Sequence, residues 1–362
     1  MTGGRGAGRT GARADGRGAR PRTAPRAPAD DVPAARLRAL LAAAPGPAAA
    51  VGALHGGTRT VLCSGGALDS TRFETGSLSK TFAALLLAEL VARGEVSYAD
   101  RADRYLPFRI PGPPMTLLHL ATHTSGLPRL PPGLIRSAVR SGWFSNPYAR
   151  FTESDLLTAL ARTRPRHRPG TRVHYSNFGG ALLGGVLARA AGGTGSDYPA
   201  LLAERITGPL ALADTTCDPG LPAATGHWHG RPRPPLRMPG LAPAGAVRSS
   251  ARDLLRVLEA LLYPETAPGR FLRTALTEVQ RPRLIIPRTG SRLCLVWNLR
   301  PRPDGPLLHH SGGTMGFTAF AGFLPHSGTG LVALTATAPT LLAPFVQAAY
   351  TTLCALPVPG RP

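Results

Sequence analysis

The fold of this chain is decided by residues 73–94, which have the sequence FETGSLSKTFAALLLAELVARG. Apolar side chains recur in this stretch at every third or fourth position, namely at Leu78, Phe82, Leu85, Leu86, Leu90 and Val91. That period predicts a helix from Ser77 to Arg93 with a wide buried face. Gly94 supplies a C-terminal stop, because glycine readily adopts the left-handed conformation that ends a helix.

The first turn of this predicted helix carries an S-x-x-K motif, formed by Ser77 and Lys80. Side chains three residues apart lie on one face of a helix, so the hydroxyl and the amine come within hydrogen-bond reach. The partial positive potential of a helix N-terminus disfavours a protonated amine and stabilises a nearby oxyanion. A neutral Lys80 can accept the proton that Ser77 must lose in order to attack a carbonyl.

Alone, this four-residue motif is weak, because a capping serine and a surface lysine give the same pattern. Lys80 is, however, the single lysine among 42 basic residues, of which 41 are arginine. Arginine replaces lysine wherever only a positive charge is needed, but its guanidinium does not deprotonate in proteins. The retained Lys80 therefore favours a catalytic role.

Composition bounds the classes of function that remain. The chain has 362 residues, 43% of them apolar, and a formal net charge of +22. The first 29 residues hold seven Arg and one Asp among Gly, Ala and Pro, which predicts a disordered arm over residues 1–31. The other basic residues are scattered, so we expect no nucleic-acid partner, although polyanion binding by the arm stays open.

Cofactors, metals and membranes are not expected either. The four cysteines form no C-x-x-C pair, and the histidines of His227-Trp228-His229 lack an evident third ligand. No run of 18 apolar residues is present, which predicts no membrane span. The N-terminus lacks the compact apolar region of a signal peptide, so we expect a cytoplasmic location.

Strand patterns occur toward both ends of the chain. They are Ala48–Leu54, Thr58–Cys63, Leu293–Leu299, Leu307–Ser311, Thr318–Leu324 and Gly330–Ala336. Helical patterns lie between them, and a last helix is predicted over Pro339–Leu356. This order predicts an α+β fold, in which both termini build one antiparallel sheet flanked by helices. The expected parts are a sheet subdomain (about 32–112 and 241–362) and a helical insertion (about 113–240).

Two further motifs combine groups that acyl chemistry needs. Tyr175-Ser176-Asn177 supplies a phenol that can relay protons and an amide that can bond both Lys80 and a substrate carbonyl. His310-Ser311-Gly312-Gly313 ends an apolar strand, where the Gly313 and Ser77 amides together can form an oxyanion hole. A capping Asn beside a packed Tyr, and an ordinary turn, are the simpler alternatives.

Taken in order, these motifs resemble those of the β-lactamase-related serine hydrolases. This group includes class C β-lactamases, D-alanyl-D-alanine carboxypeptidases, D-aminopeptidases and many esterases. The resemblance covers about residues 32–362 and rests on residues 73–82, Thr122–Pro128, Tyr175–Asn177 and His310–Gly313. It implies a β-lactamase/DD-peptidase-like fold.

The resemblance also implies the roles of the site residues. Ser77 would be the acylated nucleophile, Lys80 and Tyr175 would share the proton transfers, and Asn177 would orient the substrate. His310 would lie on the strand that lines the cleft. Familiar β-lactamases carry Lys-Thr-Gly or Lys-Ser-Gly on that strand, so His310-Ser311-Gly312 removes a fixed positive charge at neutral pH.

The predicted function is a serine hydrolase that acts on an ester or amide of a small molecule or peptide, in the manner of an esterase, D-amino-acid peptidase or β-lactamase. Two alternatives stay open: an acyltransferase of specialised metabolism, and a non-catalytic scaffold of the same fold. The presence of Ser77, Lys80 and Tyr175 argues against the scaffold. The sequence predicts neither the substrate's identity nor an oligomeric state.

Overall fold

The computed structural model describes residues 1–2, 32–134, 136, 139, 146–286, 289–342 and 344–356. Apart from its first two residues, the predicted N-terminal arm lies outside the described residues.

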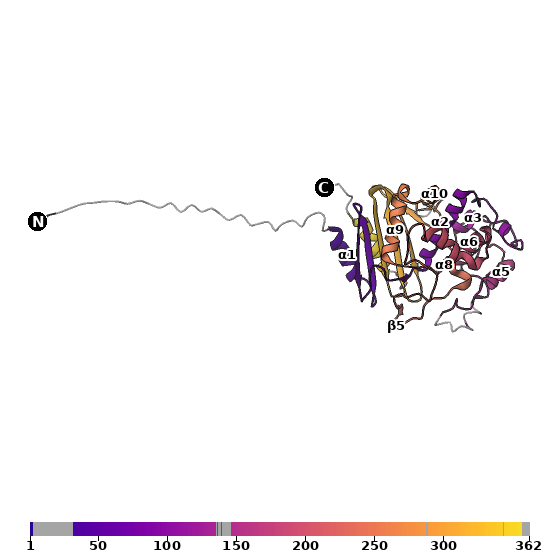
Figure 1. Cartoon of the computed structure of the whole chain (residues 1–362), viewed down its shortest axis with the longest axis horizontal. Helices are drawn as coiled ribbons and strands as arrows, with labels where there is room; N and C mark the ends of the chain where they lie inside the picture. Colours follow the sequence, from indigo (N-terminus) through magenta and orange to yellow (C-terminus); the bar gives the residue numbers. More distant parts are fainter. Residues whose placement is uncertain are drawn as a thin grey trace.

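Both ends of the chain contribute to one eight-stranded antiparallel sheet, in the order β2-β1-β12-β11-β10-β9-β8-β7 (Figure 1), which ends in the short strand β7 (Leu284–Ile285). The long strands are β1 (Ala49–His55), β2 (Thr58–Ser64), β10 (Leu307–Gly313), β11 (Thr318–Leu324) and β12 (Thr329–Thr335). Strand β1 lies between β2 and β12, with Ala49 opposite Thr335 and Leu54 opposite Gly330. The predicted α+β fold with a sheet from both termini is confirmed.

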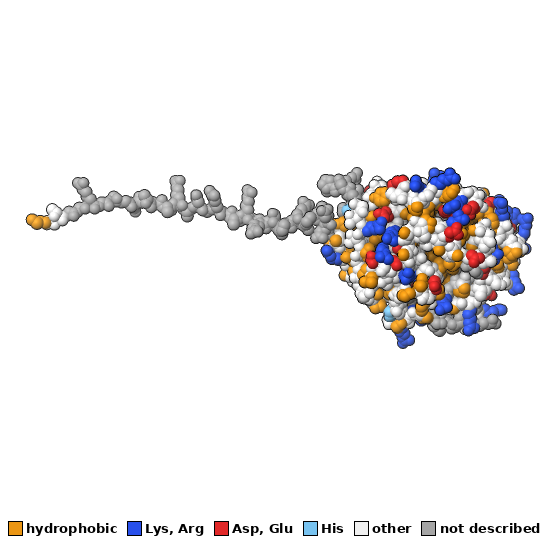
Figure 2. Space-filling view, viewed as in Figure 1, with side chains coloured by type: hydrophobic (Ala, Val, Ile, Leu, Met, Phe, Trp, Pro, Cys, Tyr) orange, Lys and Arg blue, Asp and Glu red, His pale blue; other side chains and the backbone are white. Residues whose placement is uncertain are grey.

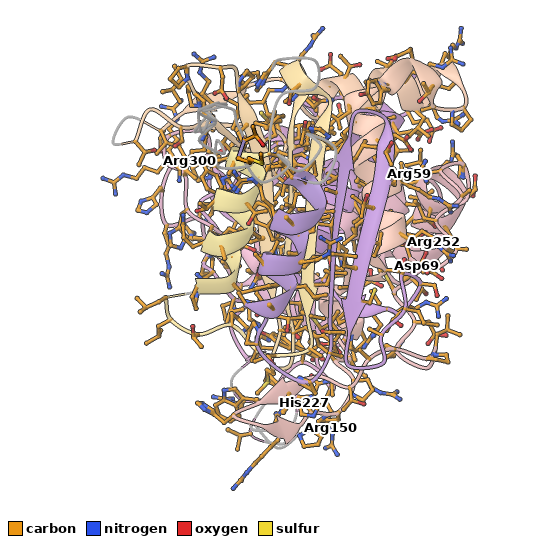
Figure 3. The ribbon with its side chains drawn as sticks, turned by 90° about the vertical axis from the view of Figure 1, so that its left-hand side faces the viewer. Arg59, Asp69, Arg150, His227, Arg252 and Arg300 are labelled. Carbon is orange, nitrogen blue, oxygen red and sulfur yellow. The ribbon has the colours of Figure 1, made fainter. Side chains whose placement is uncertain are left out.

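Each face of the sheet is covered by helices. Successive strand residues point to opposite faces, so apolar residues along one strand contribute to two separate clusters. Val51 and Ala53 of β1 belong to a cluster with α1 (Val32–Ala42) and α11 (Pro344–Ala355), which lie side by side across the strands in Figure 3. Ala50 and Leu54 belong to the larger core on the other face, which α9 (Ala251–Leu262) covers. The sheet is therefore buried on both sides.

The helix predicted from residues 73–94 begins as a 3-10 turn, Gly76–Leu78, and continues as α2 (Ser79–Arg93). Every residue of α2 from Ser79 to Leu90 is buried, and Gly94 ends the helix with a φ of 78°. The helix packs against α6 (Asn177–Ala190), α8 (Ala242–Gly245) and α10 (Arg270–Glu278). It is thus the central helix on which the site is built.

The remaining helices are short and lie mostly at the end of the molecule away from β1 and β2 (Figure 1). Their bounds are Leu117–Ala121 for α3, Glu153–Ala161 for α5 and Tyr198–Leu202 for α7. Thr116 and Thr152 each close a capping box at the start of α3 and α5, which explains where these helices begin.

The prediction of one strand over Leu293–Leu299 is wrong. The segment forms two short paired strands, β8 (Arg292–Leu293) and β9 (Asn298–Arg300), joined by a buried turn in which Cys294 N–H donates to Trp297 O at 2.9 Å. Val296 takes a φ of 67° there. The segment contains no Gly or Pro, so the local sequence gave no signal for a turn there. Tertiary packing, which buries the turn, decides the backbone conformation instead. The last helix also begins at Pro344, five residues after the predicted start.

The described surface mixes both signs of charge. Figure 2 shows acidic and basic side chains interspersed on the visible face, and the ion pairs found among the described residues each join an arginine to an Asp or Glu. No helix within the described ranges is both long enough and apolar enough to span a bilayer.

Candidate active site

Ser77 is held against the end of β10 by two glycines. A Cβ added to Gly312 would lie 1.9 Å from Thr75 O and 2.8 Å from Ser77 N, and one added to Gly76 would lie 2.6 Å from Gly313 O. No side chain fits between these two pieces of backbone. The glycines therefore bring the Ser77 amide and the exposed Gly313 to one place, as an oxyanion hole requires.

The register of β10 decides where the Gly313 amide points. Thr314 N–H donates to Phe317 O at 2.9 Å, so Thr314 and Phe317 form a hydrogen-bonded pair of the antiparallel ladder. Gly313 lies opposite Thr318 in the next, non-bonded pair, and its N–H points away from β11. Strand β9 pairs only with Leu307–His309, so that side of Gly313 is free to face the cleft it lines with Ser77.

This close approach gives a stability prediction. Gly312→Ala is expected to lower the free energy of unfolding by about 1–3 kcal/mol and to reduce activity, because the new methyl group must push β10 off Thr75 and Ser77. Gly185→Ala is the matched control, since its nearest neighbour, Gly195 Cα, is 3.7 Å away and alanine favours helix α6. Urea unfolding of both variants checks this. A Gly312→Ala protein as stable and active as the control would contradict it.

Lys80 lies one turn along from Ser77 and is 1% exposed. Its Nζ donates to Ser77 Oγ at 3.1 Å and to the carbonyl oxygen of Ala244, in α8, at 2.6 Å. Its methylenes pack on Gly180 of α6, where an added Cβ would lie 3.1 Å from Lys80 Cε. The amine is thus fixed in a dry position facing the hydroxyl.

Burial lowers the pKa of the Lys80 ammonium to about 7, and the positive charge of Arg129 contributes to the same shift. A large fraction of Lys80 is therefore neutral at physiological pH, as a general base must be. Within the described residues no carboxylate is paired with Lys80 to oppose this shift.

Tyr175 completes a triad of side chains. Its hydroxyl donates to Ser77 Oγ at 2.5 Å, and its ring lies 4.9 Å from Lys80 Nζ. Burial raises the pKa of Tyr175, so the phenol stays protonated and can donate. The nucleophile predicted from the sequence thus accepts hydrogen bonds from both residues predicted to move its proton.

The Tyr175–Asn177 segment is locked onto the Thr122–Pro128 loop. Ser176 caps α6 by accepting from Gly179 N–H, and its own hydroxyl donates to Pro128 O at 2.7 Å. Asn177 N–H donates to Arg129 O at 2.8 Å. The expected hydrogen bond from Asn177 to Lys80 does not form; Lys80 Nζ donates to Ala244 O instead. Asn177 lines the cleft, and its buried Oδ1 accepts no hydrogen bond from a described residue.

His310 and Ser311 lie where β10 passes the cleft, and both line it with Ser77. Burial lowers the pKa of His310 to about 3, with the charges of Lys80 and His309 as further causes. The ring is therefore neutral at pH 5–8, and protonation at mildly low pH does not restore the positive charge of a lysine there. Strand β10 offers a neutral wall.

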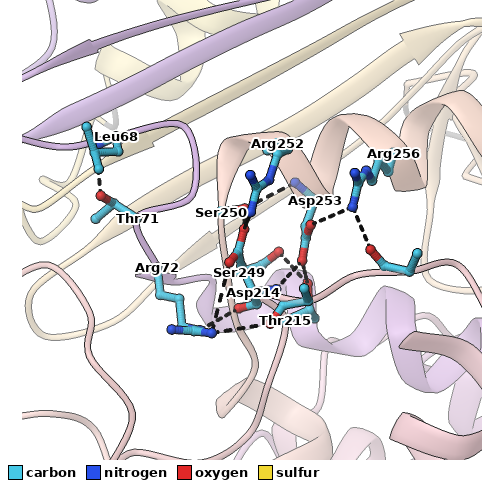
Figure 4. A network of polar contacts seen from close by, with 12 residues as sticks. Leu68, Thr71, Arg72, Asp214, Thr215, Ser249, Ser250, Arg252, Asp253 and Arg256 are labelled. Carbon is cyan, nitrogen blue, oxygen red and sulfur yellow. Dashed lines mark hydrogen bonds and ion pairs between the residues drawn. The ribbon is translucent and has the colours of Figure 1, made fainter. Parts of the chain in front are cut away.

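A polar network behind the site holds its backbone (Figure 4). Asp253 Oδ2 accepts from Asp214 N–H at 2.7 Å and from the Thr215 hydroxyl at 3.0 Å, and Thr215 Oγ1 lies 2.8 Å from Ser249 Oγ. Ser249 belongs to β6 (Arg248–Ser249), which pairs with β3 (Phe73–Glu74) just before Ser77. The network thereby fixes the strand that leads into the nucleophile.

Sequence reasoning missed two groups at the site, the Ala244 carbonyl and Arg129, and it gave His123 of the Thr122–Pro128 motif only a role in the structure of that loop. His123 is buried beside the Tyr175 ring, with centroids 4.6 Å apart, and burial lowers its pKa to about 3. Arg129 directly follows the Thr122–Pro128 motif, so the sequence could have indicated that it lies near the site. Nothing in the sequence indicates which carbonyl meets Lys80.

The cleft in front of Ser77 has a volume of about 520 Å³ and continues toward Tyr148, Asn177 and Met315. It is lined by no Asp or Glu among the described residues. Across all the residues that the structure describes, no group of three or more His, Cys, Asp or Glu side chains is arranged to hold a metal ion. The groups at hand are a serine, a buried amine, a phenol, an amide and two backbone N–H donors.

A sheet from both termini, with a serine and a buried lysine one turn apart on the central helix, defines the class of the β-lactamase-like α+β proteins. The chain belongs to the Beta-lactamase family, whose model matches residues 34–352. The resemblance inferred from the motifs is confirmed.

Curated relatives agree with this family. The chain is 28% identical to the D-alanyl-D-alanine-carboxypeptidase/endopeptidase AmpH of Escherichia coli K12, over 70% of this chain and 68% of that protein. It is 28% identical to the Beta-lactamase of the same strain, over 73% and 75% of the two chains. It is 30% identical to the human Putative beta-lactamase-like 1, over 75% of this chain and 55% of that protein. These names support a hydrolase.

Proposed function

We propose that this protein is a serine hydrolase that forms an acyl-enzyme on Ser77 with an ester or amide substrate and releases the acyl group to water. One observation carries the proposal. Ser77 Oγ accepts hydrogen bonds from both the buried Lys80 amine, at 3.1 Å, and the Tyr175 hydroxyl, at 2.5 Å. A serine that only capped a helix would not require a buried lysine beside it whose pKa is lowered to about 7.

In the acylation step, neutral Lys80 accepts the Ser77 proton as Oγ attacks the substrate carbonyl carbon. The Ser77 and Gly313 amides stabilise the oxygen that becomes negative. Tyr175 donates its proton to the departing alcohol or amine as the bond to the leaving group breaks, and the proton held on Lys80 restores the phenol. The products are an ester on Ser77 and a neutral leaving group.

In the deacylation step, a water molecule attacks the acyl carbon and gives up its proton to the Tyr175–Lys80 pair. The acyl carbon–Oγ bond breaks, Ser77 Oγ takes a proton back, and a carboxylic acid leaves. Positioned acid–base groups typically contribute about 10²–10⁴-fold, and each oxyanion donor roughly 3–4 kcal/mol. An alcohol or amine in place of water would make the same intermediate an acyltransferase.

Turnover of an activated aryl ester, a D-Ala-D-Ala peptide and a penicillin, each with and without an added alcohol or amine, tests the function. Hydrolysis of at least one substrate, with a rapid burst of leaving group stoichiometric with protein, supports the proposal. Products that appear only as new esters or amides would favour acyl transfer. Folded protein that acylates with none of the three would favour a scaffold.

The pH dependence of this hydrolysis is expected to follow Lys80. The base works when deprotonated, so kcat/KM should rise as pH increases through an apparent pKa near 7 and stay low below it. His123 and His310 have pKa values of about 3, and burial raises that of Tyr175, so none of them competes in this range. A pH–rate profile with a stable aryl ester checks this. An acid limb near pH 4, or above pH 9, would contradict the assignment.

A further inference from the structure

Arg129 lines the cleft, and no described Asp or Glu forms an ion pair with it. Its side chain is exposed, its guanidinium carbon lies 5.4 Å from the centroid of the Tyr175 ring, and Tyr175 in turn bonds Ser77. Its backbone is fixed, because Arg129 O accepts from both Asn177 N–H and Phe178 N–H. The positive charge thus lies at the cleft, over the ring of the tyrosine that contacts Ser77.

Other arginines near the site have partners. Arg72 donates to Asp214 O, Arg252 is paired with Asp214 and Arg248 with Glu74. Among the described residues, no hydrogen bond or ion pair engages the Arg129 guanidinium, and no Asp or Glu lines the cleft. A guanidinium stacked on an aromatic face keeps its edge of N–H donors free, and that edge matches a carboxylate bidentately.

We propose that Arg129 determines substrate specificity by binding a carboxylate of the substrate, so that this hydrolase prefers acyl substrates bearing a carboxylate over neutral ones. The inference rests on the proposed function and names the substrate class of the same site. Recognition of the negative charge would then not depend on β10, where His310 is neutral, but on the part of the cleft lined by Tyr175 and Arg129. Arg129 would act on binding, since Lys80 and Tyr175 carry the proton transfers.

The test compares two matched pairs of aryl esters that carry a carboxylate or the corresponding carboxamide. In one pair the group is on the acyl side, as in the mono-4-nitrophenyl ester of glutaric acid; in the other it is on the leaving group, as in an ester of 3-hydroxybenzoic acid. Arg129→Gln is expected to raise KM about 10- to 100-fold for the carboxylate ester of one of the two pairs. All constants are measured at pH 9, where Lys80 is neutral in both proteins, because loss of the Arg129 charge raises the Lys80 pKa. Under these conditions kcat for the carboxylates, and both constants for the carboxamides, should change less than about threefold.

Arg162→Gln is the control, because Arg162 is an exposed arginine at the end of α5, outside the cleft. It removes the same charge from a protein whose net charge is +22. If both variants lose the carboxylate preference equally, general attraction explains it and the inference is wrong. A preference that is absent in the unchanged protein, or that persists in Arg129→Gln, overturns it as well.

Binding separates this inference from the proposed function. Calorimetry with the Ser77→Ala protein and the uncleaved ester pairs reports recognition without turnover. Tighter binding of the carboxylate member, lost when Arg129→Gln is added, supports the role of Arg129 even if no ester is hydrolysed. Equal binding of both members of both pairs overturns it, even if Ser77 proves to be acylated normally.

Discussion

Lys80→Arg is expected to slow the hydrolysis of activated esters by about 10²–10⁴-fold, the contribution of a positioned general base. The substitution keeps the positive charge but removes the group that deprotonates, since an arginine guanidinium does not lose its proton in proteins. Burial lowers the Lys80 pKa to about 7 because the amine is dry and close to Arg129. A guanidinium in the same place would stay charged and could not accept the Ser77 proton.

The space around Lys80 makes a second variant necessary. Gly180 leaves no room beyond the lysine methylenes, so the wider arginine strains the packing of α2 against α6. Lys80→Met fills a similar volume without charge and should lose activity to the same extent while melting cooperatively. Kinetics and thermal unfolding of both variants check this prediction. Either variant turning over esters at the original rate would show that Lys80 is not the base.

Ser77→Ala is expected to lower kcat/KM by roughly 10⁴-fold or more, since removing a nucleophile abolishes the covalent path rather than weakening it. The fold should be unaffected, because Ser77 is half-buried in the cleft and, among the described residues, its Oγ is hydrogen-bonded to Lys80 and Tyr175 alone. Steady-state hydrolysis of the best substrate of the panel measures the loss.

Ser64→Ala is a suitable control for this prediction, because Ser64 is an exposed serine at the end of β2, outside the cleft. It should retain full activity. If Ser77→Ala kept more than about a tenth of the original rate in protein free of other hydrolases, the path would not pass through Ser77, and the proposed mechanism would have to be abandoned.

Much of the fold followed from local patterns in the sequence. The apolar period of residues 73–94 predicted α2, and the short apolar runs bounded by turn residues near both ends predicted the long strands of the sheet. The prediction was wrong at Leu293–Leu299, where a buried turn around Val296 contains only apolar residues. It also missed α10, whose apolar positions Leu272, Ala275 and Leu276 are separated by polar ones in a short helix that packs on α2.

At the site, the sequence could predict which side chains share one helical face, as with Ser77 and Lys80, but not which distant groups meet them. The Ala244 carbonyl comes from a Pro-rich region 164 residues away from Lys80, and a backbone oxygen leaves no trace in residue type. Asn177 was expected to meet Lys80, yet packing of α8 against α2 gives that position to Ala244. Such tertiary partners depend on helix packing, which the local pattern does not specify.

The acyl-enzyme on Ser77 can be detected by intact-mass spectrometry, followed by peptide mapping, of protein quenched within the burst of an activated ester. We expect a mass increase of one acyl group per chain, located on Ser77, formed faster as pH rises through about 7 and absent in Ser77→Ala. A folded protein that gains no acyl group, or gains it on a residue other than Ser77, would contradict the central claim.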